Sequence, residues 1–196
     1  MFGATKSPRE SLEKAIELAQ TVIAQDDNDP YGHAILGWLS CLKREYDKAI
    51  AEGERAVALN PSGSMVHVYY GQSLMYAGQP EEAITVLRKA IRLNPFCPDW
   101  YYLIYGMAFR MVGKFEESVS AYKKVLQSGP NNIFAHIGLA ATYSMMGREQ
   151  EASAEAAEVL RTNPKFSVDS YSKRSLYKDQ SETDKVANAL RKAGLK

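Results

Sequence analysis

The chain contains very little cysteine: only Cys41 and Cys97 occur among its 196 residues, and their spacing follows no pattern. Disulfide frameworks and structural zinc sites require several cysteines at defined spacings, so neither is predicted. Two isolated thiols are typical of a reducing compartment. We therefore expect a cytoplasmic protein.

An excess of charge of one sign is also missing. The 24 basic and 23 acidic residues leave a formal net charge of +1. Binding to nucleic acid or to an anionic membrane surface favours a strongly basic protein. We therefore expect no nucleic-acid partner.

Long apolar runs are absent as well. The run "WYYLIYGMAF" extends from Trp100 to Phe109 without a charged residue but stops at Arg110. A bilayer-spanning helix needs roughly 20 apolar residues. The opening "MFGATKSPRES" has no apolar core of the kind found in signal peptides. We expect no membrane insertion.

The sequence does contain an internal repeat of 34 to 35 residues. An Asn-Pro or Gly-Pro pair recurs at Pro61, Pro95, Pro130 and Pro164. A small residue inside an apolar segment keeps the same register at Gly37, Gly71, Gly106 and Ala140. A glycine recurs at Gly78, Gly113 and Gly147, and a second small residue at Ala49, Ala83, Ser118 and Ala152. Periods of this length indicate a stacked array of supersecondary units.

Each unit is predicted to form two helices, as the third unit illustrates. Asp99 is placed to cap a first helix over 100–112, and Gly113 can adopt the left-handed conformation that ends it. A second helix is expected over 115–127, and Pro130 ends it because proline has no backbone donor. The recurring small residues, such as Gly106 and Ser118, would allow the two antiparallel helices to cross closely.

This pattern resembles the tetratricopeptide repeat (TPR) family over residues 30–166, roughly 70% of the chain. The third unit matches the family positions with Tyr102, Tyr105, Gly106, Phe109, Ser118, Tyr122, Val125 and Pro130. The first unit departs from them at Ser40 and Gly53. The resemblance implies an all-α, right-handed TPR solenoid of antiparallel helix pairs, which serves as a non-enzymatic protein-protein interaction module.

The implied organisation is an N-terminal segment over 1–29, repeats over 30–63, 64–98, 99–132 and 133–166, and a C-terminal capping segment over 167–196. Residues 8–25 align with the second helix of a repeat, because Ala15 and Ile16 match Ala49 and Ile50. The preceding residues hold no helix to complete that pair. This leading half-repeat is therefore either a capping helix or the start of a fragment cut from a longer protein.

The tail is predicted to hold a short helix, a loop and a final helix. The final helix would begin with a capping-box spacing at Ser181, carry Val186 and Leu190 on one face, and end at Gly194. The blocks "NPKFSV", "YKD" and "ALRKAGL" resemble the ends of TPR arrays that follow class III adenylate or guanylate cyclase domains in bacterial multidomain proteins. That resemblance implies an alternative function, as the sensory or assembly region of a signalling protein.

No arrangement of residues predicts catalysis or a cofactor. The phosphate-binding patterns GxxxxGK[ST] and GxGxxG do not occur, and neither does the nucleophile pattern GxSxG. His33, His67 and His136 all fall at position 4 of their units. Equivalent side chains on packed helices are about 8–10 Å apart, too far to share a metal ion. We expect these imidazoles to replace the usual aromatic residue between paired helices, with no metal bound.

The first helices carry a second apolar stripe besides their core stripe. In the TPR family these positions line a concave groove, and they hold one charged residue in this chain, Arg110. The basic side chains by which some family members bind acidic peptide tails are otherwise absent, so that subtype is rejected. The predicted groove residues are Tyr31, Trp38, Met65, Gln72, Met75, Tyr76, Trp100, Leu103, Met107, Arg110, Met111, Phe134, Ile137 and Met145.

Such an apolar surface has two main explanations, besides the simple packing of some of these residues against neighbouring first helices. It binds an unidentified protein partner that presents an apolar or amphipathic peptide or helix. Alternatively it is covered by the protein itself, either by the C-terminal tail or by a second copy in a homodimer. The sequence leaves both explanations open.

Overall fold

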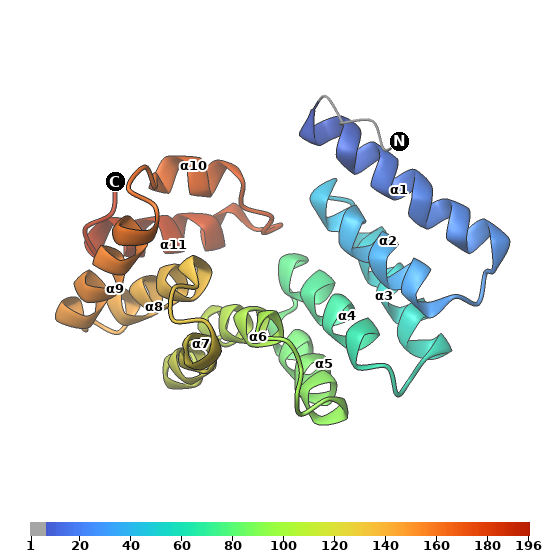
Figure 1. Cartoon of the computed structure of the whole chain (residues 1–196), viewed down its shortest axis with the longest axis horizontal. Coiled ribbons are helices and arrows are strands. Elements are labelled where there is room, and N and C mark those ends of the chain that lie inside the picture. The colour runs from blue at the N-terminus through green and yellow to red at the C-terminus, as the bar shows by residue number, and fades with distance from the viewer. Residues whose placement is uncertain (1–6) are drawn as a thin grey trace.

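The computed structural model describes residues 7–196, and all the regular elements in this range are α-helices (Figure 1). The prediction for the residues before Ser7 lies outside this range. The helices are α1 (Pro8–Gln25), α2 (Pro30–Leu42), α3 (Tyr46–Leu59), α4 (Ser64–Tyr76), α5 (Pro80–Leu93), α6 (Trp100–Met111), α7 (Phe115–Ser128), α8 (Ile133–Met145), α9 (Glu149–Thr162), α10 (Val168–Lys173) and α11 (Gln180–Lys192). In this part of the chain, none is both long and apolar enough to cross a bilayer.

The turns inside the helix pairs follow the glycine pattern. Gly78, Gly113 and Gly147 have φ values of +88°, +74° and +74°, a left-handed conformation that glycine adopts without steric cost. The first pair has Arg44 at the matching position, with φ of +61°. A side chain in this conformation costs roughly 1–2 kcal/mol, so the fold accepts local strain there.

One predicted cap and one predicted helix start are wrong, although α6 begins at Trp100 as predicted. Asp99 has helical backbone angles and does not cap α6; its Oδ2 instead accepts a 2.6 Å hydrogen bond from Ser128 Oγ. The last helix begins before Ser181, because Asp179 is the N-cap and accepts a 2.8 Å bond from the Ser181 amide. The Asp99 side chain thus bonds the end of α7 and not the first turn of α6, and Asp179 takes the capping role expected of Ser181. The predicted end of α11 is confirmed by Gly194, whose φ is +104°.

The small residues at the helix crossings have the predicted role. Ser118 Oγ in α7 donates a 2.8 Å hydrogen bond to the Gly106 carbonyl in α6. A Cβ atom added at Gly106 would lie 2.9 Å from the ring of Tyr122. Larger side chains at this crossing would therefore push the two helices apart.

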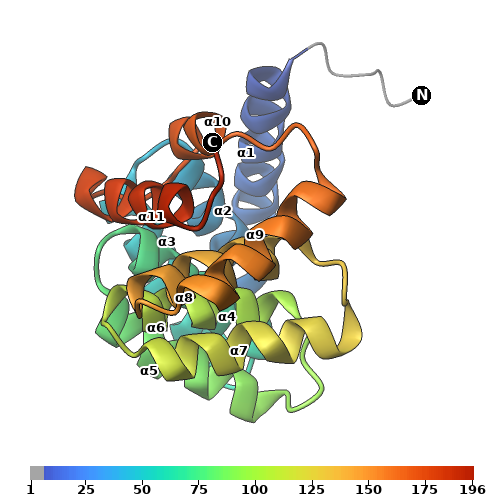
Figure 2. The same cartoon turned by 90° about the vertical axis from the view of Figure 1, so that its left-hand side faces the viewer.

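The helix pairs stack into two layers along an arc (Figure 1). Each first helix (α2, α4, α6, α8) packs against its own second helix, and successive first helices also touch one another. The second helices (α3, α5, α7, α9) form the outer layer. Figure 2 shows the array turned by 90°, with α10 and α11 on the opposite side from α5 and α7. The first helices therefore line the concave face.

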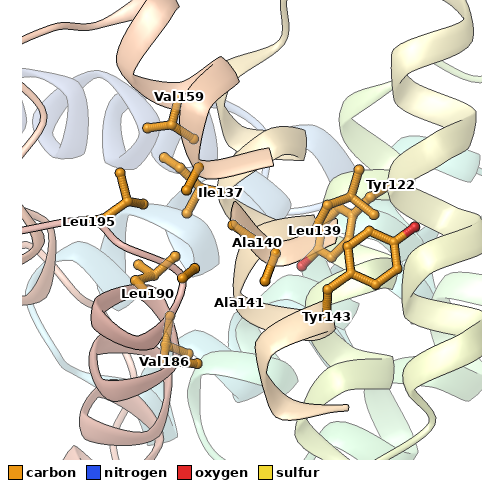
Figure 3. Close-up of a cluster of buried hydrophobic side chains, with 14 of the residues drawn as sticks. Tyr122, Ile137, Leu139, Ala140, Ala141, Tyr143, Val159, Val186, Leu190 and Leu195 are labelled. Atoms are coloured by element: carbon orange, nitrogen blue, oxygen red, sulfur yellow. The ribbon is translucent and has the colours of Figure 1, made fainter. Parts of the chain in front are cut away.

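The tail closes the C-terminal end of the core. Val186 and Leu190 of α11 pack against α8, where Ile137 and Ala141 belong to the same buried cluster (Figure 3). The Val168 amide donates a 2.7 Å hydrogen bond to the Lys196 carbonyl and so ties the two ends of the tail together.

Among the residues that the structure describes, α1 has less cover than the other second helices. Val22 is 42% exposed, although the residues at the matching repeat position are 0% exposed. Those residues are Ala56, Ala90, Val125 and Val159. The second helices that carry them pack on the first helices of their own repeats, whereas the main packing partner of α1 among the described residues is α2.

Candidate functional site: the concave face and the tail that crosses it

The tail segment 174–178, hereafter the crossing segment, lies over the concave face and contacts the first three repeats. Its Ser175 carbonyl accepts a 2.8 Å hydrogen bond from Arg44 Nη2, and its Leu176 carbonyl accepts a 2.9 Å bond from Tyr46 Oη. Arg44 is the residue that replaces a turn glycine. Its side chain thus provides a contact that glycine could not make.

Tyr177 is the central side chain of the crossing segment and is 5% exposed. Its hydroxyl accepts a 3.0 Å hydrogen bond from Arg110 Nη2 in α6. Its ring lies 5.5 Å, centroid to centroid, from that of Tyr76 in α4, whose carbonyl accepts a 2.8 Å bond from the Lys178 amide. The tail therefore covers the ends of the groove-lining helices where residues 76 and 110 lie.

Within residues 7–196, Arg110 is a buried cation whose side-chain hydrogen-bond partners are neutral hydroxyls, although Glu182 stabilises its charge at longer range. Arg110 is 5% exposed, and its Nη1 donates a 3.1 Å hydrogen bond to the Tyr122 hydroxyl. Burial raises the pKa of both Tyr122 and Tyr177, outweighing the opposing effect of Arg110, so both phenols stay neutral near pH 7. Among residues 7–196, no carboxylate oxygen lies within 4 Å of the Arg110 guanidinium.

A cavity of about 580 Å³ lies between the concave face and the tail. Trp100, Leu103, Met107 and Phe134 line its inner wall, and residues of the tail, including Leu176, line the other side. Ligand pockets typically measure about 300–1,000 Å³ and combine apolar walls with a few polar groups. This cavity has both properties.

The structure brings eight of the fourteen predicted groove residues to this cavity. They are Gln72, Tyr76, Trp100, Leu103, Met107, Arg110, Phe134 and Ile137. Phe134 is 64% exposed at the rim, whereas Ile137 is only 4% exposed.

The other six predicted residues lie elsewhere. Met75 is 0% exposed, so its prediction as a groove surface residue is wrong; it belongs to a buried cluster formed by side chains of α4, α5 and α6. Trp38 stacks on Tyr76 with ring centroids 5.9 Å apart. Tyr31 and Met65 are about 40% exposed and do not line the cavity. Met111 and Met145 are half-buried and do not line the cavity.

The three histidines are bound separately within the helix pairs. Nδ1 of His33 lies 2.6 Å from Glu52 Oε2, and Nδ1 of His136 lies 2.6 Å from Glu155 Oε2. Nδ1 of His67 instead bonds the Gly63 carbonyl at 2.8 Å. Within the described range, no three or more His, Cys, Asp or Glu side chains are grouped so as to hold a metal ion.

Both cysteines are buried free thiols. Burial raises the pKa of Cys41 to about 11, against a weaker opposing hydrogen bond from Ser73. The thiolate is the nucleophilic form of cysteine, and at pH 7 this thiol is protonated.

The fold and the groove define a helical-repeat solenoid with a concave ligand-sized site. Two tetratricopeptide repeat models match residues 71–133 and 110–171, together just over half of the chain. The chain belongs to the tetratricopeptide repeat family, whose members act as protein-protein interaction modules.

Curated relatives are longer than this chain. Protein STIP1 homolog of Dictyostelium discoideum is 31% identical over 132 residues, which cover 62% of this chain and 23% of the relative. Small glutamine-rich tetratricopeptide repeat-containing protein 2 of Mycosarcoma maydis is 26% identical, covering 60% of this chain and 33% of the relative. The chain thus spans a third or less of these two proteins.

Solved structures show the same fold. The pilus biogenesis factor PilW superposes with a TM-score of 0.73 at 18% identity, covering 93% of this chain and 82% of that one. MamA gives a TM-score of 0.65 at 22% identity, covering 80% and 91%. YrrB gives 0.63 at 18% identity, covering 91% and 92%.

Proposed function

We propose that the chain binds an apolar or amphipathic peptide segment of a protein partner in the cavity between the concave face and the crossing segment. The observation that carries this proposal is the apolar lining of a cavity of about 580 Å³ that opens beside the exposed Phe134 ring. An apolar surface that stays accessible in a folded protein usually marks an interaction site.

The groove residues suit a variable partner. Methionine side chains adapt to different shapes, and aromatic rings provide large contact areas at low entropic cost. The inner wall carries both kinds, with Trp100 and Met107. A structural neighbour, YrrB, is described as a TPR protein with an unusual peptide-binding site, which supports the same kind of function here.

The proposal is tested with peptides selected on the purified chain from a random display library. The double variant Trp100→Ala/Met107→Ala is expected to weaken their binding by about 30-fold, or about 2 kcal/mol. The matched control is Leu93→Ala/Leu160→Ala, which removes two exposed leucines of the outer helices and should leave affinity unchanged. Unchanged affinity in a folded groove variant contradicts the proposal.

Two alternatives remain predictions. The three sequence blocks that resemble cyclase-linked arrays each contribute a buried side chain to the packing of the tail on the repeats. These side chains are Val168, Tyr177 and Leu190. A cyclase domain upstream in the native gene would support the signalling role. A homodimer with a covered groove would sediment as two chains at micromolar concentration.

A further inference from the structure

We propose that the N-terminal end of the array docks a basic amphipathic α-helix of a partner protein, in the position that a first helix occupies in each repeat. Four exposed apolar side chains form this surface, hereafter the end face. They are Leu18 and Val22 on α1, and Tyr31 and Ile35 on α2, at one end of the arc (Figure 1). These side chains do not line the cavity, so the end face is an interaction surface separate from the proposed peptide site.

The end face is exposed at positions that the other repeats bury. Val22 is 42% exposed, although its four matching residues are fully buried, and Ile35 is 40% exposed, although its match Ile104 is 4% exposed. Inside the array, one first helix covers both positions. For example, α4 packs on α5 and on α6, and Ala90 and Ile104 share its buried cluster. The end face is therefore the surface that one more first helix would cover.

The two helices present one continuous apolar surface. Leu18 and Val22 lie one helical turn apart on α1, and Tyr31 and Ile35 lie one turn apart on α2. The two pairs meet at Gly32, where an added Cβ atom would lie 3.2 Å from Val22 Cγ1. An amphipathic helix binds such a surface by laying its apolar stripe between two packed helices.

The face of α1 also has a counterpart in α9, which a first helix of this chain already covers. At three matching positions the two helices hold the same residue types. They are Ala15, Ala19 and Val22 in α1, and Ala152, Ala156 and Val159 in α9. In α9 these residues are buried in one cluster with Leu139 and Ala140 of α8. A helix with the apolar pattern of α8 therefore fits α1.

The start of α1 indicates that the docked helix comes from another protein. α1 has 18 residues, whereas α3, α5, α7 and α9 have 14 each. Its extra turn begins at Pro8, and Ser7 caps it by accepting a 3.2 Å hydrogen bond from the Glu10 amide. Residues 9–11 are thus helical, at positions where the repeats turn from first to second helix. A first helix joined to α1 by that turn is incompatible with this start.

The charge of the N-terminal end specifies the chemistry of the partner. Residues 8–29 carry six acidic and two basic side chains. A second copy of this chain would bring the same negative charge to the contact and be repelled. A helix with Lys or Arg beside its apolar stripe would be attracted. Salt should weaken this attraction, because the screening length is about 10 Å at 0.1 M ionic strength.

Fluorescence anisotropy of labelled helix peptides tests the inference. The probe has the sequence of α8, residues 133–145, with lysines added at both ends, and the matched probe carries glutamates in their place. At low salt the lysine probe is expected to bind wild type about ten-fold or more tightly than the glutamate probe. Circular dichroism should show that the lysine probe gains helix on binding, and the difference between the probes should shrink at high salt.

Variants assign the binding to the end face. Leu18→Gln/Val22→Gln removes two apolar side chains and is expected to weaken binding of the lysine probe by about ten-fold or more. The matched control is Leu93→Gln/Leu160→Gln, which changes two exposed leucines of the outer helices and should leave affinity unchanged. The groove variant Trp100→Ala/Met107→Ala should also keep wild-type affinity for this probe. Thermal unfolding establishes that each variant is folded.

Several results overturn the inference. Failure of the lysine probe to bind, or equal binding of the two probes, would exclude a site for a basic helix. Wild-type affinity in folded Leu18→Gln/Val22→Gln would place the binding elsewhere, and loss of affinity in the groove variant would assign it to the concave face. A wild-type dimer that dissociates in Leu18→Gln/Val22→Gln, as seen by sedimentation, would assign the end face to a second copy. Binding of library-selected peptides in the groove is decided separately from all these outcomes.

Discussion

The guanidinium of Arg110 donates a 3.0 Å hydrogen bond to the hydroxyl of Tyr177, which lies 67 positions later in the chain. This bond joins the third repeat to the tail across the concave face. It makes the groove a compartment with two walls, one from the first helices and one from the crossing segment. Arg110 therefore both lines the cavity and holds the tail.

Tyr177→Phe is expected to lower the free energy of unfolding by about 1–3 kcal/mol, because it leaves a buried guanidinium donor without its partner. Chemical denaturation measures the loss. Tyr31→Phe is the control, since Tyr31 is 41% exposed and its ring should tolerate loss of the hydroxyl. Equal stability of the two variants would show that the tail contact contributes nothing.

Gly138→Ala is expected to destabilise the fold by about 1–3 kcal/mol through overpacking. A Cβ atom added at Gly138 would overlap the Tyr122 ring, which must then move and disturb its 3.1 Å bond with Arg110. Gly129→Ala is the control, because the nearest atom to its added Cβ is 3.7 Å away. The free energy of unfolding is measured in urea. If both variants are as stable as wild type, the close packing of α7 and α8 is contradicted.

Val86→Glu is expected to stabilise the protein by about 1 kcal/mol. Val86 occupies the repeat position at which Glu52 and Glu155 bind the histidines of the first and fourth repeats. Nε2 of His67 is buried and, within the described residues, has no hydrogen-bond partner. Thermal unfolding tests the gain, which should vanish in a His67→Leu background; a gain that persists there would refute the pairing.

His67 also predicts a pH dependence of stability. Burial lowers its pKa below the usual 6.5, against the opposing effect of its bond to the Gly63 carbonyl. Below about pH 6.5 the unfolded chain takes up a proton that the native state resists, so the free energy of unfolding falls as the pH drops. His67→Leu should flatten this part of the curve. His33 and His136 are present in both wild type and His67→Leu, so a difference between the two curves of unfolding free energy against pH reports on His67. Parallel curves would show that His67 does not contribute.

The repeat architecture could be predicted from sequence because its signals recur. Pro, Gly and small residues keep one register, and each reflects a local need such as the φ of +74° at Gly113. The cap of α6 and the start of α11 could not be fixed in this way. The Asp99 side chain bonds Ser128, 29 positions away, and the nearby Asp179 takes the capping position that the sequence pattern assigns to Ser181.

The path of the tail was not predictable from the repeat. The sequence predicts Arg110 as the charged groove position, but its contact with Tyr177 depends on residues that lie outside the repeat. One signal was present at Arg44, where the turn glycine is missing and the side chain instead bonds Ser175. The replacement of the repeated turn glycine by Arg44, at a left-handed backbone position, is thus a sequence signal for a contact with a distant part of the chain.

The most direct test of the account maps a library-selected peptide on the protein by NMR chemical shifts. If the tail-walled cavity binds the peptide, the largest changes will fall on Trp100, Met107, Phe134 and Leu176, which line it. Changes centred on the outer helices α5 and α7, with these four residues unaffected, would contradict the account.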